Sequence, residues 1–228
     1  GWQGEIDRNV LALFLRYNCI PAPYSIYKNI FKLLPGTFIS VQQEDITKNT
    51  TSPLAPNHYW SAREIAEAGA NEPLDHTEEE TINQLDAHLR NAIKGQMIAD
   101  VSLGAFLSGG VDSSTVVALM QAQSTQRVKT FTIGFEEEAY NEAHDAKAVA
   151  KHLGTDHTEL YVTPQEAMSV IPNLPSLYDE PFSDSSQIPT YLISKLARQH
   201  VTVSLSGDGG DELFGGYNRY FWGKRIWK

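Results

Sequence analysis

Cysteine is scarce in this chain, because Cys19 is the only one in 228 residues. A single thiol excludes an internal disulfide bond and is typical of a protein of the reducing cytoplasm. Long apolar runs are also lacking, since no stretch approaches the roughly 18 apolar residues of a membrane-spanning helix. No secretory signal peptide is visible either. We therefore expect a cytoplasmic protein without a membrane partner.

Basic charge is scarce as well. The chain has 18 Lys and Arg residues against 28 Asp and Glu residues, so its net charge is -10. Proteins bind nucleic-acid phosphates through clustered Lys and Arg, and we therefore expect no nucleic-acid partner. An initiator Met is missing too, and the sequence stops in the aromatic, basic run 220–228. These ends predict a piece of a longer polypeptide.

The first part of the chain has few clear patterns. Apolar residues at helical spacing predict a short helix within residues 5–18. Residues 31–41 contain a Pro-Gly turn between apolar runs and predict a β-hairpin. Residues 42–58 are rich in Thr, Ser, Asn and Pro, which predicts a loop.

A polar stretch at 67–76 indicates a boundary between two domains. We expect the first domain to cover residues 1–66 and the second to cover residues 77–228, with 67–76 as the linker. The linker and the last residues, 218–228, are the parts that we expect to be mobile.

The second part alternates between apolar strands and amphipathic helices. Thr77 and Glu80 fit a capping box at the start of a helix over 78–97. Strands are then predicted at about 102–107, 128–135, 157–162 and 201–205, and helices at 112–123, 141–153, 164–178 and 187–199. This alternation predicts an α/β fold, a doubly wound parallel sheet with helices on both faces.

Residues 106–114 read Phe-Leu-Ser-Gly-Gly-Val-Asp-Ser-Ser and form the most informative stretch. An apolar strand enters a pair of glycines, whose backbone N–H groups can approach a ligand closely, and a helix follows. The two serine hydroxyls after Asp112 can donate to phosphate oxygens, but the carboxylate of Asp112 would repel a bare phosphate. We therefore expect a pyrophosphate site that includes a divalent cation. A plain strand-to-helix turn is the alternative.

A second glycine-rich loop follows the last predicted strand, at residues 206–217. It carries Asp208, Asp211 and Glu212. Ligands of open α/β sheets bind outside the carboxyl ends of the strands, and two such loops at one edge can face each other. We therefore expect Asp112 and Asp211 to hold Mg²⁺ against a pyrophosphate. An acidic surface loop is the alternative.

Both loops resemble those of a known family. Residues 108–114 look like the pyrophosphate loop of the N-type ATP pyrophosphatases, and residues 206–217 resemble the signature of glutamine-dependent asparagine synthetases. Residues 179–186 and 188–192 are also similar to that family. In the first part, two short stretches resemble the tail of the family's N-terminal glutaminase domain. They are Lys-Leu-Leu-Pro-Gly-Thr at 32–37 and the pair Tyr59-Trp60.

The resemblance implies a ligase with an adenine-nucleotide α-hydrolase-like fold. ATP would adenylate a carboxylate, which in asparagine synthetases is aspartate, and pyrophosphate would leave. Ammonia from glutamine would then displace AMP to give asparagine. The implied partners are these small molecules, the implied cofactors are ATP and Mg²⁺, and a homodimer is left open.

The resemblance also implies roles for single residues. ATP and its pyrophosphate would contact Leu107, Ser108, Gly109, Gly110, Asp112, Ser113, Ser114, Ile133, Gly134, Ser206 and Gly207. Catalytic roles would fall to Asp208 and Asp211, and the metal ligands would be Asp112 and Asp211. Asp208 stands where these synthetases often have Glu, so its shorter side chain puts its role in question.

Other features depart from the family. The family's glutaminase uses an N-terminal Cys, whereas Cys19 lies inside the chain, and we interpret it as a packing residue. The piece is therefore expected to be inactive as a glutaminase and to lack part of the synthetase chemistry. The seven histidines show no metal-ligand spacing, and we expect them to be solvated or helix-capping.

Three alternatives stay open. The first is the same chemistry on another carboxylate, as in uronic-acid amidotransferases or β-lactam synthetases. Whichever carboxylate is the acceptor, its pocket would use residues such as Asp179, Glu180 and Asp184. A non-catalytic ATP-binding module is a second alternative. Pyrophosphatase-loop enzymes that act on tRNA or purine nucleotides are a third, but they lack the signature at 206–217.

Overall fold

The computed structural model describes residues 4–47, 55–135 and 141–226. The chain divides into two compact units: Gly1–His76 with Asn173–Ser185, and Thr77–Pro172 with Ser186–Lys228. The path therefore passes between the units three times, after His76, Pro172 and Ser185. We call them the N-terminal unit and the sheet unit.

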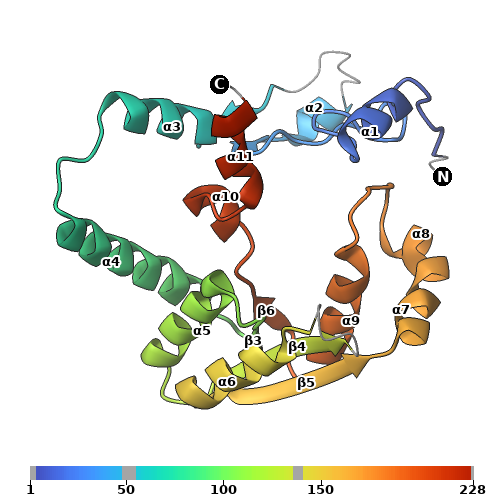
Figure 1. The fold of residues 1–228 in the computed structure, drawn as a ribbon. Coiled ribbons are helices and arrows are strands. Elements are labelled where there is room, and N and C mark those ends of the chain that lie inside the picture. Colours follow the sequence, from blue (N-terminus) through green and yellow to red (C-terminus); the bar gives the residue numbers. More distant parts are fainter. Residues whose placement is uncertain (1–3, 48–54, 136–140, 227–228) are drawn as a thin grey trace. The chain divides into compact units, whose positions relative to one another are not determined.

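The sheet unit is built on four parallel strands in the order β5-β4-β3-β6 (Figure 1). The strands are β3 (Leu103–Phe106), β4 (Lys129–Phe135), β5 (Asp156–Val162) and β6 (Val203–Leu205). All four lie within two residues of the predicted bounds. The predicted parallel sheet is therefore confirmed.

Helices of the sheet unit are α4 (Glu78–Gln96), α5 (Val111–Gln123), α6 (Ala143–Leu153), α7 (Pro164–Val170), α9 (Gln187–Ala197), α10 (Gly210–Phe214) and α11 (Asn218–Ile226). The predicted capping box is present, since Thr77 and Glu80 exchange both hydrogen bonds at the start of α4. The single helix predicted over 164–178 was wrong. Pro172 and Pro175 interrupt it, and α7 is followed by a 3₁₀ turn and the short α8 (Leu174–Leu177).

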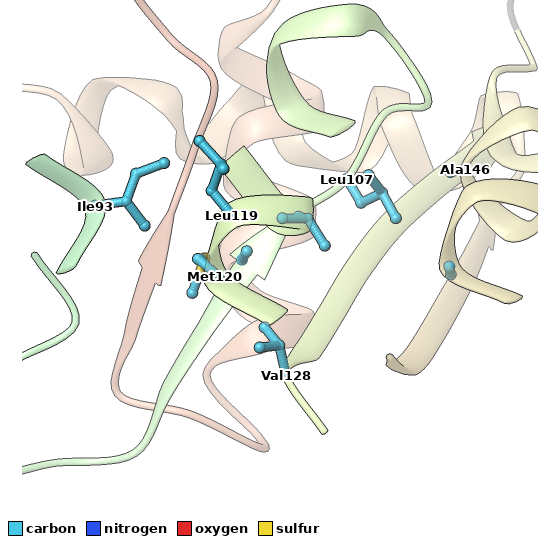
Figure 2. Packing of buried hydrophobic residues seen from close by; sticks show 9 residues of the cluster. Ile93, Leu107, Leu119, Met120, Val128 and Ala146 are labelled. Atoms are coloured by element: carbon cyan, nitrogen blue, oxygen red, sulfur yellow. The ribbon is translucent and has the colours of Figure 1, made fainter. Parts of the chain in front are cut away.

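Both faces of the sheet are covered. On one face Ala105 and Leu107 pack with residues of α4, α5 and α6, among them Ile93, Met120 and Ala146 (Figure 2). Side chains alternate along a strand, so Phe106 faces the other way. It packs there with Phe131, and with α9 and the residues after it through Ala197 and Val201. Helices therefore lie on both faces, as the alternation of the sequence predicted.

The apolar stripe of α4 is only partly buried. Ile93 is buried and Leu89 and Met97 pack against the core, but Ile82 is 57% exposed and Leu85 39% exposed. The second half of α4 thus packs against the core of the sheet unit.

The N-terminal unit contains α1 (Leu11–Tyr17), β1 (Thr37–Phe38), α2 (Gln43–Thr47), β2 (Asn57–His58) and α3 (Ala62–Asn71), together with α8. The predicted hairpin over 31–41 was wrong, because β1 pairs antiparallel with β2. The carbonyl of Gly36 accepts bonds from the N–H groups of Tyr59 and Trp60, which ties the turn to the distant strand.

Segments predicted to be a loop, a linker or a mobile end contain helices. The loop predicted over 42–58 was wrong where α2 forms, at Gln43–Thr47. The predicted linker 67–76 begins with the second half of α3, and α11 occupies most of 218–228. In the described part of the chain, no helix combines the length and the apolar character needed to cross a membrane.

Candidate functional site: two glycine-rich loops at one sheet edge

The two glycine-rich loops leave neighbouring strands. β3 and β6 pair in parallel, with Ala105 opposite Leu205, and each strand runs directly into its loop. Parallel strands end at the same edge, so both loops lie at the edge where open α/β sheets bind ligands.

Serine hydroxyls hold the first loop in shape. The N–H of Ser108 donates to Oγ of Ser113 at 3.2 Å, and the two hydroxyls lie 2.9 Å apart. The N–H of Gly110 donates to Oγ of Ser108 at 3.3 Å. The two longer bonds are at the weak end of the usual range. A phosphate that takes these N–H groups would therefore replace weak internal bonds.

Gly109 has a steric reason to be glycine. Its φ is +83°, and a Cβ built on it would lie 2.7 Å from the backbone nitrogen of Ala146 and from Cβ of Asp145. The first loop therefore lies directly against the first turn of α6. Gly110 is the N-cap of α5 and provides no side-chain cap, which leaves the first N–H groups of this helix for an anion.

The second loop packs on the first turn of α5. A Cβ on Gly207 would lie 2.7 Å from the nitrogen of Ser113, and a Cβ on Gly210 would lie 2.4 Å from Cγ of Asp112. Only residues without a Cβ allow this approach. The structure thus brings Asp112 into contact with the loop that carries Asp208 and Asp211.

Asp211 is turned toward the end of its own loop. Its Oδ1 would lie 1.9 Å from a Cβ on Gly216, and Gly209 and Gly215 have positive φ on either side of α10. Each of the two expected metal ligands therefore contacts a glycine, Asp112 at Gly210 and Asp211 at Gly216. The two carboxylates occupy space that a Cβ at Gly210 or Gly216 would fill.

The donor set fits Mg²⁺ only with help from a ligand. Among the described residues there is no group of three or more His, Cys, Asp or Glu side chains that could hold a metal. Mg²⁺ is commonly bound by one or two carboxylates, with water and substrate phosphates as its other ligands. Asp112 and Asp211 match that pattern.

Asp208 is held by its neighbour in the loop. The hydroxyl of Ser206 donates to Oδ2 of Asp208 at 2.9 Å and accepts from the Asp208 N–H at 3.4 Å. Farther along, the hydroxyl of Tyr217 donates to Oε1 of Glu212 at 3.0 Å, and this bond raises the pKa of Tyr217. The guanidinium of Arg219 lies 4.1 Å from the centre of the Tyr217 ring.

Ile133 and Gly134, two of the residues expected to contact ATP, lie near the end of β4. Gly134 pairs with Tyr161 of β5, and a Cβ on Gly134 would lie 2.7 Å from ring atoms of Tyr161 and 3.0 Å from Cβ of Ala143. Sequence reasoning missed Tyr161. The apolar strand pattern gave no sign that a tyrosine would cover this glycine.

Tyr161 belongs to a polar chain that runs from β5 to α6. Its hydroxyl donates to Oε2 of Glu159 at 2.9 Å, and Lys147 pairs with Oε1 of Glu159 at 2.9 Å. Burial favours a higher pKa for Glu159, but the bonds from Lys147 and Tyr161 outweigh it and lower the pKa. The carboxylate is therefore charged at neutral pH, and its bond raises the pKa of Tyr161.

Other expected site residues have different surroundings. Oγ of Ser114 is buried and has no hydrogen-bond partner among the described residues. Cys19 is exposed, so the interpretation as a packing residue was wrong. It directly follows Asn18, whose φ of 60° ends α1.

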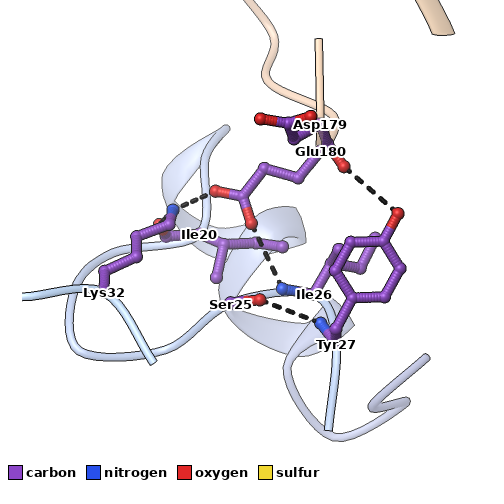
Figure 3. Close-up of polar contacts among 7 residues, drawn as sticks. All are labelled: Ile20, Ser25, Ile26, Tyr27, Lys32, Asp179 and Glu180. Carbon is purple, nitrogen blue, oxygen red and sulfur yellow. Dashed lines mark hydrogen bonds and ion pairs between the residues drawn. The ribbon is translucent and has the colours of Figure 1, made fainter. Parts of the chain in front are cut away.

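Glu180, expected in an acceptor pocket, is instead bound inside the N-terminal unit (Figure 3). Its Oε2 accepts from the N–H of Ile26 at 3.1 Å, and its Oε1 pairs with Lys32. The carbonyl of Asp179 accepts from the Tyr27 hydroxyl at 3.4 Å. Both carboxylate oxygens of Glu180 thus have partners from the first 32 residues.

An open parallel sheet with glycine-rich loops at the ends of two neighbouring strands, one of them leading into a helix N-terminus, is typical of a nucleotide-binding α/β protein. The family model for asparagine synthase matches residues 84–228. The chain belongs to the asparagine synthase family.

Several relatives match nearly the whole chain, among them the following two. A putative glutamine-hydrolysing asparagine synthetase 2 of Methanocaldococcus jannaschii is 38% identical over 223 residues, which are 97% of this chain and 41% of the relative. Asparagine synthetase 1 (glutamine-hydrolysing) of Bacillus subtilis is 33% identical over 217 residues, or 95% of this chain and 32% of the relative. The chain thus spans well under half the length of these relatives.

Among solved structures, the chain is similar to an NH3-dependent NAD synthetase from Campylobacter jejuni. The TM-score is 0.42 and the identity 16%, over 60% of each chain.

Proposed function

We propose that the sheet unit binds ATP for a ligase that makes an amide in two steps. A carboxylate oxygen attacks the α-phosphorus of ATP, the bond to the β-phosphate oxygen breaks, and an acyl-adenylate and pyrophosphate form. Ammonia then attacks the acyl carbon, AMP leaves and the amide remains. The observation that carries this proposal is the contact of the 206–217 loop with Asp112 and Ser113.

The first loop would hold the leaving pyrophosphate. Its charge has to be neutralised as the bond to the α-phosphorus breaks. The N–H groups of residues 108–112 and the hydroxyls of Ser108 and Ser113 are the groups that bind it. Mg²⁺ held by Asp112 and Asp211 supplies charge neutralisation when it is bound.

Aspartate is the proposed acceptor and glutamine the proposed source of ammonia, because two relatives are named glutamine-hydrolysing asparagine synthetases. Residues 1–66 are accordingly proposed to be the tail of a glutaminase domain, and residues 77–228 part of the synthetase domain. Asp208, bound to Ser206, is proposed to contact the activated intermediate once that bond opens.

Calorimetry with ATP·Mg²⁺ tests the nucleotide site on the chain itself. We expect Asp112→Ala to weaken binding about tenfold or more, because a charge-assisted metal contact is lost. Asp211→Ala should behave in the same way if both carboxylates hold one metal. Asp100→Ala, which removes an exposed acid of the same unit, is the matched control. Equal affinity in wild type and Asp112→Ala would contradict the proposal.

The acceptor is tested in the protein that contains this chain. AMP and pyrophosphate release should depend on aspartate and not on uronic acids. Release that depends on a sugar acid alone would keep the chemistry and overturn the proposed substrate.

A further inference from the structure

Tyr161 presents an exposed aromatic ring at the carboxyl end of the sheet. It is the second-last residue of β5 and lies directly opposite Gly134 of β4. Ring atoms come within 2.7 Å of the place where a Cβ of Gly134 would be, and the residue is nevertheless 46% exposed. The ring therefore lies against the backbone of β4 and still meets solvent.

The ring is fixed in orientation. Glu159 and Tyr161 are two residues apart on one strand, so their side chains share a face of the sheet. The Tyr161 hydroxyl donates to Glu159, whose other oxygen pairs with Lys147 of α6. The Tyr161 hydroxyl is thus held by Glu159, and its ring packs against the backbone at Gly134. A ring held in this way loses little conformational entropy when a second flat group stacks on it.

The first turn of α6 connects this ring to the first glycine loop. Cβ of Ala143 would lie in contact with a Cβ built on Gly134. Asp145 and Ala146 would likewise lie in contact with a Cβ built on Gly109. These α6 residues lie within a single turn of helix, which rises about 5.4 Å. Tyr161 is therefore close to the loop proposed to hold the phosphates.

We propose that Tyr161 forms an aromatic wall of the base site and stacks on the purine of the nucleotide. This inference rests on the proposed function, since the phosphates have to bind at residues 108–114 for the base to reach the end of β4. The simpler role of the ring is to shield Gly134, because aromatic rings commonly cover glycines of a neighbouring strand. The two roles predict different affinities once the ring is removed. Only the stacking role predicts a weaker affinity that is limited to ligands with a base.

Calorimetry on the 228-residue chain separates these roles with two probes, ATP·Mg²⁺ and inorganic tripolyphosphate·Mg²⁺. Stacking of a base on an aromatic side chain is usually strong enough that we expect Tyr161→Ala to weaken ATP binding about tenfold. Tripolyphosphate has no base, so its affinity should stay unchanged. Tyr161→Phe keeps the ring and should retain most of the ATP affinity. Tyr24→Ala, which removes an equally exposed tyrosine of the N-terminal unit, is the control.

Each outcome decides between stacking on the purine and shielding of Gly134. Equal ATP affinity in wild type and Tyr161→Ala would overturn the inference. A parallel loss of ATP and tripolyphosphate affinity would also overturn it, because the ring would then support the phosphate loop. Wild-type chain that binds neither probe would contradict the proposed function, and the inference would fall with it. Thermal unfolding of each variant shows whether the fold is kept.

Discussion

The two units of this chain are stabilised in different ways. The sheet unit contains the largest fully buried side chains, Phe131, Leu107, Met120, Val117 and Val162. Among its described residues, the N-terminal unit has one apolar cluster with three buried members, Val10, Ile20 and Ile26. Polar bonds between segments far apart in the chain, such as the pair Lys32–Glu180, 148 positions apart, add to this cluster. One unit therefore depends on burial of apolar area, and the other also on a few specific polar groups.

The largest expected effect comes from opening the core of the sheet unit. Phe131→Ala should lower the free energy of unfolding by about 3–5 kcal/mol, because it removes a buried ring and leaves a cavity. Urea denaturation of the purified variant measures the loss. Phe38→Ala in β1 is the control, since that ring is 48% exposed and should cost far less. Equal losses in the two variants would contradict the contrast between the units.

The second expected effect tests the polar contacts of the N-terminal unit. Lys32→Met should destabilise it by about 1–2 kcal/mol, since Glu180 and the carbonyl of Ile20 both lose a donor. Solvent reaches part of this pair, which keeps the expected loss small. Hydrogen exchange should rise in residues 173–185 and stay unchanged in residues 104–123.

Lys28→Met is the matched control for Lys32→Met. It breaks the ion pair with Glu5. The side chain of Lys28 is 46% exposed and that of Glu5 is 72% exposed, so the loss of stability should be much smaller than in Lys32→Met. Faster hydrogen exchange throughout both units in Lys32→Met would show that the stabilising effect of the Lys32–Glu180 pair is not confined to the N-terminal unit.

The same contrast explains what the sequence could predict. The elements of the sheet unit could be predicted from local patterns, namely apolar periodicity and a capping box. These patterns gave the positions of β3, β4 and α5 correctly. The approach of Gly207 and Gly210 to α5 was expected in outline, because glycine-rich loops after neighbouring parallel strands meet at one edge.

Predictions failed where distant polar or backbone groups decide the structure. The hairpin at 31–41 did not form because Gly36 bonds to Tyr59 and Trp60, and no local pattern encodes that partner. The bonds of Glu180 to Ile26 and Lys32 were not predicted, because these partners lie 154 and 148 positions away in the chain. Tyr161 was missed because its contact with Gly134 depends on strand register, which a single strand pattern does not give.

A third prediction concerns the start of the sheet unit. Thr77→Ala removes the side chain that caps α4 and should cost about 1 kcal/mol. Thr163→Ala removes the same kind of capping box from α7 and should cost a similar amount. Thr77→Ser keeps the hydroxyl oxygen and should restore most of the stability in urea denaturation. No loss in either alanine variant would mean that these caps add little to a unit with a buried core.

Even the sheet unit contains a buried polar chain. Oγ1 of Thr130 lies 2.9 Å from Oγ1 of Thr155 and 2.9 Å from Nδ1 of His157. Nε2 of His157 is buried and has no hydrogen-bond partner in the part of the chain that the structure describes. The expectation that every histidine is solvated or capping was therefore wrong at His157. Burial lowers the pKa of His157, the charge of Lys147 lowers it further, and the charge of Glu159 opposes both.

The smallest expected effect is the pH dependence that this histidine adds. Its ordinary pKa is about 6.5 and its pKa in the folded state is lower, so the unfolded chain binds more protons between the two values. The free energy of unfolding should therefore fall as the pH drops from about 7.5 through 6.5, and the decrease should end below the folded pKa. His157→Gln should make the curve flatter in urea denaturation at pH 7.5 and 5.5. Parallel slopes in wild type and His157→Gln would show that protonation of His157 does not oppose folding.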